Sequence, residues 1–142
     1  MTDSESHQRP RLLIVDDEMR ILTALQRALR REGYAIQTAE TPDEGLSLLD
    51  QGHVDMVLSD NKMPGMSGLQ FLSEARRRQP HLVCFLITGW TESVPSEELE
   101  RCGVRKLLTK PWDNETLRGL LREAMEEKGF VFPGSTPPES AG

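Results

Sequence analysis

The segment LLIVDDE, residues 12–18, joins four consecutive apolar residues directly to three acidic ones. A short apolar run that contains the β-branched residues Ile14 and Val15 is typical of a strand buried on both faces. After the acids, apolar residues recur every three or four positions from Ile21 to Leu29, and Gly33 marks a stop. The segment therefore predicts a buried strand, a charged turn and an amphipathic helix, which together begin a βα unit.

The same alternation of short apolar runs and helical periodicity continues along the rest of the chain. Five strands are expected, at residues 12–15, 35–39, 56–59, 82–87 and 105–108. Five helices are expected after them, at residues 21–29, 41–52, 67–79, 96–103 and 114–128, and the fourth is unusually short. Because parallel crossovers are right-handed and cover both faces of a sheet, this order predicts an α/β fold with helices on both faces.

Length and composition favour one globular domain. The 142 residues suit a single core, expected at residues 11–128, with a flexible N-terminus at 1–10 and a flexible Pro/Gly/Ser-rich tail or linker at 129–142. A net charge of −6 has the wrong sign for tracking nucleic-acid phosphates, so no direct nucleic-acid binding is expected. No apolar run approaches the roughly 20 residues of a membrane span, and no secretory signal is visible, so we expect a cytoplasmic protein without membrane insertion.

Acidic residues follow two of the expected strands directly. Asp16 and Asp17 come after the first strand and Asp60 after the third, so these carboxylates should meet at one edge of a parallel sheet. Crowded carboxylates raise one another's pKa or require a cation, and a hard oxygen site of this kind suits Mg²⁺. The alternative is that Asp16 or Asp17 only caps the following helix.

A hydroxyl and an ammonium group are expected at the same edge. Thr88 ends the fourth strand, and Lys110 follows the fifth. A hydroxyl, an amine and a metal-bound carboxylate could together bind a phosphoryl group. Taken singly, Thr88 could be an ordinary strand-end residue and Lys110 a solvated charge, but both occur at the ends that the phosphoryl site requires.

With these motifs in place, the sequence closely resembles the receiver domain of two-component response regulators over about residues 11–128. The resemblance implies a doubly wound five-stranded parallel sheet of order 2-1-3-4-5. The motifs that carry it are Val15-Asp16-Asp17-Glu18, Ser59-Asp60, Met63-Pro64-Gly65-Met66-Ser67-Gly68, Thr88-Gly89 and Leu108-Thr109-Lys110-Pro111.

The resemblance also implies roles for single residues. Asp60 is expected to accept a phosphoryl group from a histidine kinase or a phosphotransfer protein, while Thr88 and Lys110 bind its oxygens. Mg²⁺ is the expected cofactor, held by Asp16, Asp17, Asp60 and the main-chain carbonyl of Lys62. The Lys110–Pro111 bond is expected to be cis, which would help to aim Lys110 inward. Such a protein is a signalling response regulator and not an enzyme, because it catalyses only its own phosphorylation and dephosphorylation.

Phosphorylation is expected to switch an interaction surface at the fourth strand, fourth helix and fifth strand. The expected downstream partner is an output domain or protein. The chain could also pair with a second copy of itself as a homodimer.

One position departs from the family pattern. Leu107 stands two residues before Thr109, where receivers usually carry an aromatic side chain that couples to the switch threonine, and we expect Leu107 to lie in the core. This departure keeps open a phosphorylation-independent pseudo-receiver that acts as a protein-interaction module. A Mg²⁺-dependent aspartyl phosphatase for small molecules is a third reading, but it would need an acid where Lys62 stands.

Overall fold

Five strands alternate with five helices in the part of the chain that the computed structural model describes, residues 9–89 and 92–132. The strands are β1 (Arg11–Val15), β2 (Ala35–Ala39), β3 (Met56–Asp60), β4 (Val83–Gly89) and β5 (Val104–Lys110). The helices are α2 (Met19–Leu29), α3 (Pro42–Gln51), α4 (Gly68–Arg78), α5 (Ser96–Arg101) and α6 (Asn114–Glu127). The predicted α/β alternation is therefore confirmed, and no helix within these ranges has the length and apolar character needed to cross a bilayer.

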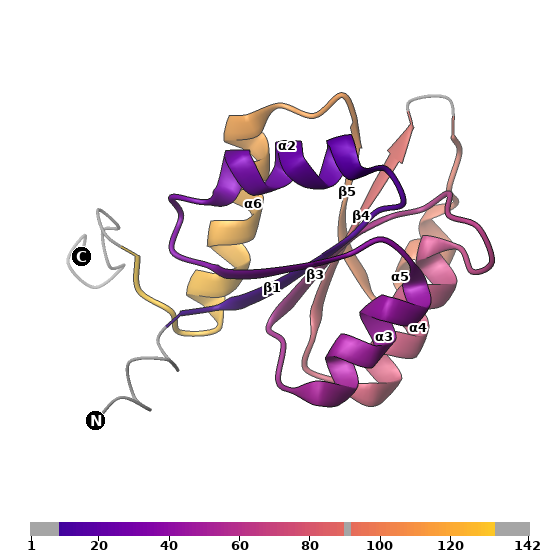
Figure 1. Ribbon diagram of the computed structural model, residues 1–142, viewed down its shortest axis with the longest axis horizontal. Coiled ribbons are helices and arrows are strands. Elements are labelled where there is room, and N and C mark those ends of the chain that lie inside the picture. The colour runs from indigo at the N-terminus through magenta and orange to yellow at the C-terminus, as the bar shows by residue number, and fades with distance from the viewer. Residues whose placement is uncertain (1–8, 90–91, 133–142) are drawn as a thin grey trace.

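All strands run parallel in a single sheet of order β2-β1-β3-β4-β5, as expected (Figure 1). The register places Val15 of β1 beside Ser59 of β3, so the residues that follow these two strands lie next to each other. At the same edge of the sheet, Asp60 pairs with Ile87 of β4. The topology thus gathers the ends of β1, β3, β4 and β5 at one edge.

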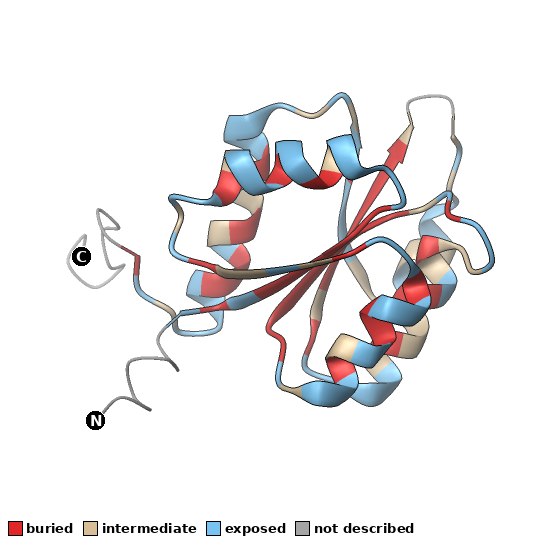
Figure 2. Ribbon diagram, viewed as in Figure 1, coloured by how far each residue is buried: buried red, intermediate tan, exposed pale blue. Residues whose placement is uncertain are grey.

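The sheet separates two apolar cores. Alternate residues of β1 supply both, because successive strand side chains point to opposite faces. Leu12 and Ile14 join the core beneath α2 and α6, whereas Leu13 and Val15 join the core beneath α3 and α4. Figure 1 shows these two helical layers, and Figure 2 shows buried residues along the central strands and on the inward sides of the helices.

The start of α4 fixes the turn that follows β3. Ser67 caps the helix in a capping box with Gln70, and each residue satisfies a main-chain amide of the other. The next residue, Gly68, donates from its amide to the carbonyl of Asn61 at 2.8 Å. A Cβ atom at position 68 would collide with the main chain of Asp60. Glycine at this position therefore lets α4 approach the end of β3.

The edge strand β5 is poorly covered, and this overturns one expectation. Leu107 is 38% exposed and does not lie in the core. Its register partner Leu86 belongs to the α3/α4 core, so Leu107 lies on the face where α5 is the nearest helix in sequence. α5 has only six residues and none of them is buried, so it leaves Leu107 uncovered.

Packing extends past the predicted domain boundary at residue 128. Phe132 is 4% exposed and meets the ring of Tyr34 edge-on, with 5.8 Å between ring centroids. The guanidinium of Arg122 lies 5.4 Å from the centroid of the Phe132 ring, within cation–π range. Phe130 and Phe132 therefore pack on the core, which corrects the predicted start of the flexible tail at residue 129. The rest of the predicted tail (133–142) and the N-terminal residues 1–8 lie outside the described residues.

Substituting Phe132 tests this C-terminal packing. We expect Phe132→Ala to lower the free energy of unfolding by about 3 kcal/mol, the lower end for loss of a buried phenylalanine. Val131, which is 82% exposed, provides the neighbouring control, and Val131→Ala should change stability by less than about 0.5 kcal/mol. Urea unfolding of both variants measures the difference, and equal effects would contradict the packing role of Phe132.

Candidate functional site

Four of the residues expected at the site converge on the carboxyl edge of the sheet. Asp16 directly follows β1, Asp60 ends β3, Thr88 lies in β4 and Lys110 ends β5. Asp16, Asp60 and Thr88 are nearly inaccessible to solvent, with 1%, 4% and 2% exposure. Polar side chains buried so deeply at the ends of adjacent strands indicate a site rather than a solvated surface.

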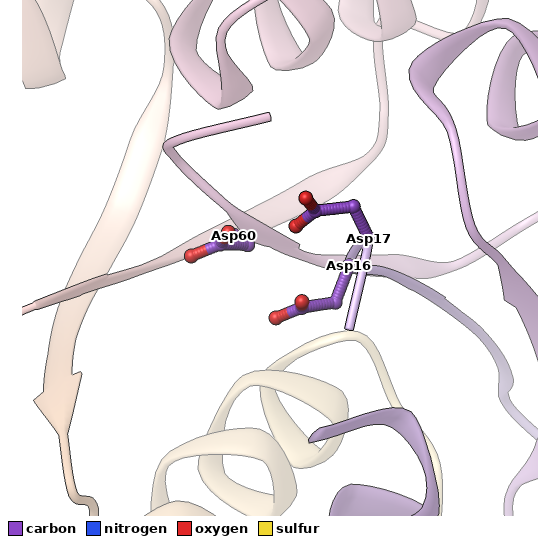
Figure 3. A group of neighbouring side chains, drawn as sticks. All are labelled: Asp16, Asp17 and Asp60. Carbon is purple, nitrogen blue, oxygen red and sulfur yellow. The ribbon is translucent and has the colours of Figure 1, made fainter. Parts of the chain in front are cut away.

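Three aspartates form a cluster that could hold a metal ion. One carboxylate oxygen each from Asp16, Asp17 and Asp60 lies within 4.8 Å of the others. Figure 3 shows Asp16 and Asp17 projecting from the turn after β1 towards Asp60 at the end of β3. Such a set of hard oxygen ligands suits Mg²⁺.

Helix capping does not explain this arrangement, because α2 has no side-chain cap hydrogen bond. Asp16 Oδ1 accepts a hydrogen bond from the amide of Glu18, the N-cap of α2, at 2.9 Å. Asp16 Oδ2 is buried and has no hydrogen-bond partner among the described residues. Because an unsatisfied buried carboxylate oxygen is costly, the cluster fits a cation that would complete its coordination.

Lys110 is the cation that the described side chains bring to this cluster. Its Nζ lies 3.1 Å from Asp60 Oδ1, 3.6 Å from Asp16 Oδ2 and 3.8 Å from Glu18 Oε1. One ammonium group thus faces three carboxylates, and net negative charge remains. The Lys110–Pro111 peptide bond is cis, as the resemblance implied.

Burial and charge shift the pKa values of the site. Burial, supported by the nearby charges of Asp60 and Asp17, raises the pKa of Asp16 to about 6 against the Glu18 hydrogen bond and Lys110. The pKa of Asp60 is raised by burial, although its hydrogen bond to Lys110 opposes the shift. Burial lowers the pKa of Lys110, but the hydrogen bond to Asp60 and the surrounding acids raise it overall. The site therefore binds positive charge or protons more readily than isolated side chains would.

For two expected site residues, Thr88 and Lys62, the structure gives a position but no hydrogen bond or ion pair with Asp60. Thr88 is the register partner of Thr109 and follows Ile87, the partner of Asp60, so it lies one strand away from the acid. Lys62 has an exposed side chain in the turn between β3 and α4. The main-chain carbonyl of Lys62 as a metal ligand stays a prediction.

A hydrogen-bonded bridge beside Asp60 was not predicted from the sequence. The carboxylate of Glu92 accepts from the amide of Gly89 at 2.6 Å and from the Asn61 side chain at 3.2 Å. Asn61 Oδ1 in turn accepts from the amide of Leu69 in α4, at 3.2 Å. This network joins the end of β4 to the turn after Asp60. No sequence signal distinguishes Glu92 from the other acids that follow it.

The family assignment follows from a comparison with known domains. A family model for the response regulator receiver domain matches residues 12–122. The chain belongs to this family. The receiver domain is a signalling unit rather than a classical enzyme, and the recognition made from the acid, threonine and lysine motifs is confirmed.

Curated relatives are bacterial transcriptional regulators that contain a receiver region similar to this one. The hydrogenase transcriptional regulatory protein HoxA of Cupriavidus necator is 35% identical over 126 residues, which cover 88% of this chain and 26% of HoxA. The transcriptional regulatory protein GlrR of Escherichia coli is 35% identical over 122 residues, 86% of this chain and 28% of GlrR. The receiver domain thus spans about a quarter of the length of these relatives.

Solved structures share the receiver fold. The signal receiver domain of an HD domain-containing protein from Pseudomonas fluorescens Pf-5 has a TM-score of 0.79 and 31% identity, covering 84% of this chain and 97% of that one. A CheY-like receiver domain protein from Methanospirillum hungatei JF-1 also has a TM-score of 0.79, at 29% identity, covering 84% of this chain and 96% of that one. The predicted fold class is confirmed by the strand order of the sheet and by the similarity to solved receiver domains.

The raised pKa of Asp16 makes stability depend on pH. The folded receiver binds a proton on Asp16 more tightly than the unfolded chain does, so this contribution to stability is lost as pH rises through about 6. In Mg²⁺-free buffer, we expect Asp16→Asn to raise the free energy of unfolding by roughly 2 kcal/mol at about pH 8 and by much less near pH 4.

Urea unfolding at both pH values measures this effect. Asp43→Asn is the matched control, because Asp43 is an exposed residue in the first turn of α3. A loss of stability in Asp16→Asn at high pH would contradict the prediction, since it would mean that attraction to Lys110 outweighs the cost of burying the charge.

Proposed function

We propose that this receiver domain takes a phosphoryl group from a histidine kinase or a phosphotransfer protein onto Asp60. The contact that carries the proposal is the 3.1 Å approach of Lys110 Nζ to Asp60 Oδ1, next to a second buried carboxylate, Asp16. Through this contact, the ammonium group of Lys110 lies beside Asp60, whose position at the end of β3 matches that of the phosphoacceptor in the family. One ammonium group does not neutralise all the neighbouring carboxylates, so a further cation is expected.

The transfer needs positioning and charge neutralisation rather than additional covalent chemistry. An Asp60 carboxylate oxygen forms the new bond to phosphorus as the phosphorus–nitrogen bond of the donor phosphohistidine breaks. The bonding electron pair stays on the imidazole nitrogen, which takes up a proton. Lys110 offsets the charge on the phosphoryl oxygens, and the Thr88 hydroxyl donates a hydrogen bond to one of them.

Mg²⁺ is the proposed cofactor. Asp16, Asp17, Asp60 and the Lys62 main-chain carbonyl would hold it, and it would supply positive charge where carboxylate and phosphoryl oxygens meet. The Oδ2 atom of Asp16 supports this assignment, because it is buried and accepts no hydrogen bond among the described residues. Lys110 alone does not balance the acids, because it already contacts Asp60, Asp16 and Glu18.

Phosphorylation would switch the surface formed by β4, α5 and β5. The phosphoryl group adds negative charge and acceptor oxygens beside Thr88, which favours the state in which the hydroxyl turns inward. Moving a state from 1% to 99% occupancy requires about 5.5 kcal/mol of differential stabilisation. α5 has no fully buried residue and packs on the core only through partly buried side chains such as Leu99, so the exposed Leu107 lies on a weakly anchored surface.

The partners follow from this proposal. Upstream we propose a sensor histidine kinase or phosphotransfer protein, and downstream an output domain or protein, in the cytoplasm of a bacterium. The curated relatives are named as transcriptional regulators and are roughly four times longer than the matched region. In a longer protein, residues 133–142 would be the linker to the output domain, and a homodimer is a further assembly to test.

Asp60→Asn tests the phosphoacceptor. After incubation with Mg²⁺ and acetyl phosphate, wild type should gain the mass of one phosphoryl group, because a carboxylate is the required nucleophile. Asp60→Asn should gain none, and the control Asp43→Asn should behave as wild type. Intact-mass spectrometry gives the result, and Trp112 fluorescence reports the accompanying conformational change.

Two results would overturn the proposal. A phosphoryl gain in Asp60→Asn would place the acceptor elsewhere. Failure of wild type to gain a phosphoryl group from either acetyl phosphate or purified phosphorylated histidine kinases would favour the pseudo-receiver that acts without phosphate. Turnover of small phosphate monoesters would instead indicate an aspartyl phosphatase.

Mg²⁺ should stabilise the folded protein through the same acids. At a concentration about 100 times its dissociation constant, a ligand of the folded state adds about 2.7 kcal/mol to the free energy of unfolding. We expect this gain in wild type and its near disappearance in Asp16→Asn. Thermal unfolding with and without Mg²⁺ measures it, and an equal gain in both proteins would exclude Asp16 as a ligand.

A further inference from the structure

A pair of histidines lies at the edge of the sheet opposite the acid cluster. His53 belongs to the connection between α3 and β3, and His81 to the connection between α4 and β4. These connections enter neighbouring strands, since Met56 of β3 pairs with Val83 of β4 (Figure 1). The imidazole rings lie nearly parallel, with 4.6 Å between centroids, and His53 Nδ1 is 3.1 Å from His81 Nε2.

A buried carboxylate holds the imidazole ring of His53. Asp55 Oδ2 accepts from the amide of Arg11 at 2.8 Å, and Asp55 Oδ1 lies 2.8 Å from His53 Nε2. A carboxylate only accepts, so in the neutral imidazole the tautomer that donates from Nε2 to Asp55 leaves the lone pair on Nδ1. Nδ1 is also the His53 nitrogen that lies 3.1 Å from His81 Nε2. A carboxylate that holds the outer nitrogen of an imidazole is the usual support of a metal-binding histidine.

The two connections are held together independently of the histidines. The side chain of Gln79 accepts from the amide of Val54 at 3.0 Å and donates to the carbonyls of Leu49 and Gly52 at 2.8 and 2.9 Å. The amide of Val83 also donates to the carbonyl of Asp55, at 3.1 Å. The backbone that carries both rings is therefore positioned before any ligand arrives, which lowers the cost of binding.

From this arrangement we propose that His53 and His81 form a binding site for a divalent transition metal ion of the Zn²⁺, Cu²⁺ and Ni²⁺ class. The metal would replace the hydrogen bond between the rings. The proton on Nε2 of His81 would move to Nδ1 of the same ring through solvent, and Nδ1 of His53, Nε2 of His81 and water molecules would bind the metal. Imidazole nitrogens favour these ions, whereas Mg²⁺ prefers the oxygens at the other edge of the sheet.

The distance between the nitrogens suits this role. Two nitrogens bound at about 2.0–2.1 Å to one tetrahedral Zn²⁺ lie about 3.3 Å apart, close to the 3.1 Å observed. The nearly parallel rings require one imidazole to turn towards the metal. His81 can do so because it is exposed and its last side-chain torsion is soft, while Asp55 keeps His53 in place.

Burial favours the neutral form of the exposed His81 imidazole. Burial, His53 and Lys128 lower the pKa of His81, against the opposing effects of Asp55 and the Val54 main chain. A neutral imidazole is the form that binds metal, so protons compete weakly with the metal near pH 7. The ammonium of Lys128, 3.4 Å from the Asp55 carbonyl, also repels a metal cation, so Lys128→Gln should strengthen binding.

Zn²⁺ titration of the full chain tests the site. Calorimetry in excess Mg²⁺ and a thiol-free reductant keeps the acid cluster occupied and the cysteines reduced. Wild type should bind one equivalent, and His53→Gln and His81→Gln should each lose at least about tenfold in affinity. Asp55→Asn should lose about tenfold, in the range seen when the support of a metal-bound histidine is altered. The chain's third histidine provides the control, and His7→Gln should bind as wild type.

A spectroscopic measurement on wild type keeps the test independent of variant folding. Bound Cu²⁺ should show couplings from two imidazole nitrogens in its electron paramagnetic resonance spectrum, and His81→Gln should remove one of them. His81 is exposed, so this variant should retain the wild-type unfolding curve and phosphoryl acceptance at Asp60. Unchanged Zn²⁺ affinity in both histidine variants, or a Cu²⁺ spectrum with oxygen ligands alone, would overturn the proposal.

Discussion

Repulsion between buried carboxylates is the constraint on which this receiver domain depends. Asp16 and Asp60 are almost inaccessible to solvent, and Asp17 joins them within 4.8 Å. Burial in a medium of low dielectric constant makes their mutual repulsion stronger than it would be in water. Lys110 relieves part of the repulsion, and a further cation bound between the carboxylates would relieve the remainder. The fold therefore maintains an excess of negative charge at the carboxyl edge of the sheet.

The sheet maintains this excess of charge because both cores hold its strands in register. β1 is buried on both faces, and a shift by one residue would exchange its core side chains between the two helical layers. The register therefore fixes Asp16 beside the end of β3. Gly68 allows α4 to close against the main chain of Asp60 from the other side. The acids cannot move apart without disturbing packing that supports the whole domain.

The sequence was informative where local pattern and topology agree. The strands at 35–39 and 56–60 and the fourth helix at Ser96 were predicted almost to the residue, because turn and capping residues mark their ends. Leu107 was misplaced because an apolar residue in a strand does not reveal whether a helix covers it. The domain boundary was set too early, at residue 128, because the length of a Pro/Gly/Ser-rich tail does not show that Phe132 has a partner such as Tyr34. His53 and His81 escaped notice because pairing them requires the register of β3 and β4.

The shallow anchoring of α5 has a consequence for the dynamics of the domain. A helix of six residues that contacts the core only through a partly buried side chain, Leu99, gains little from tertiary packing, and its isolated stability is low. Its amides should exchange with solvent through small local openings, at free energies far below that of global unfolding, whereas amides of β1 and β3 should exchange only when the whole domain unfolds. Activation of the receiver would then change the relative populations of the folded and locally unfolded states of α5, while the neighbouring sheet stays rigid. The free-energy barrier between these states would depend on this one short helix.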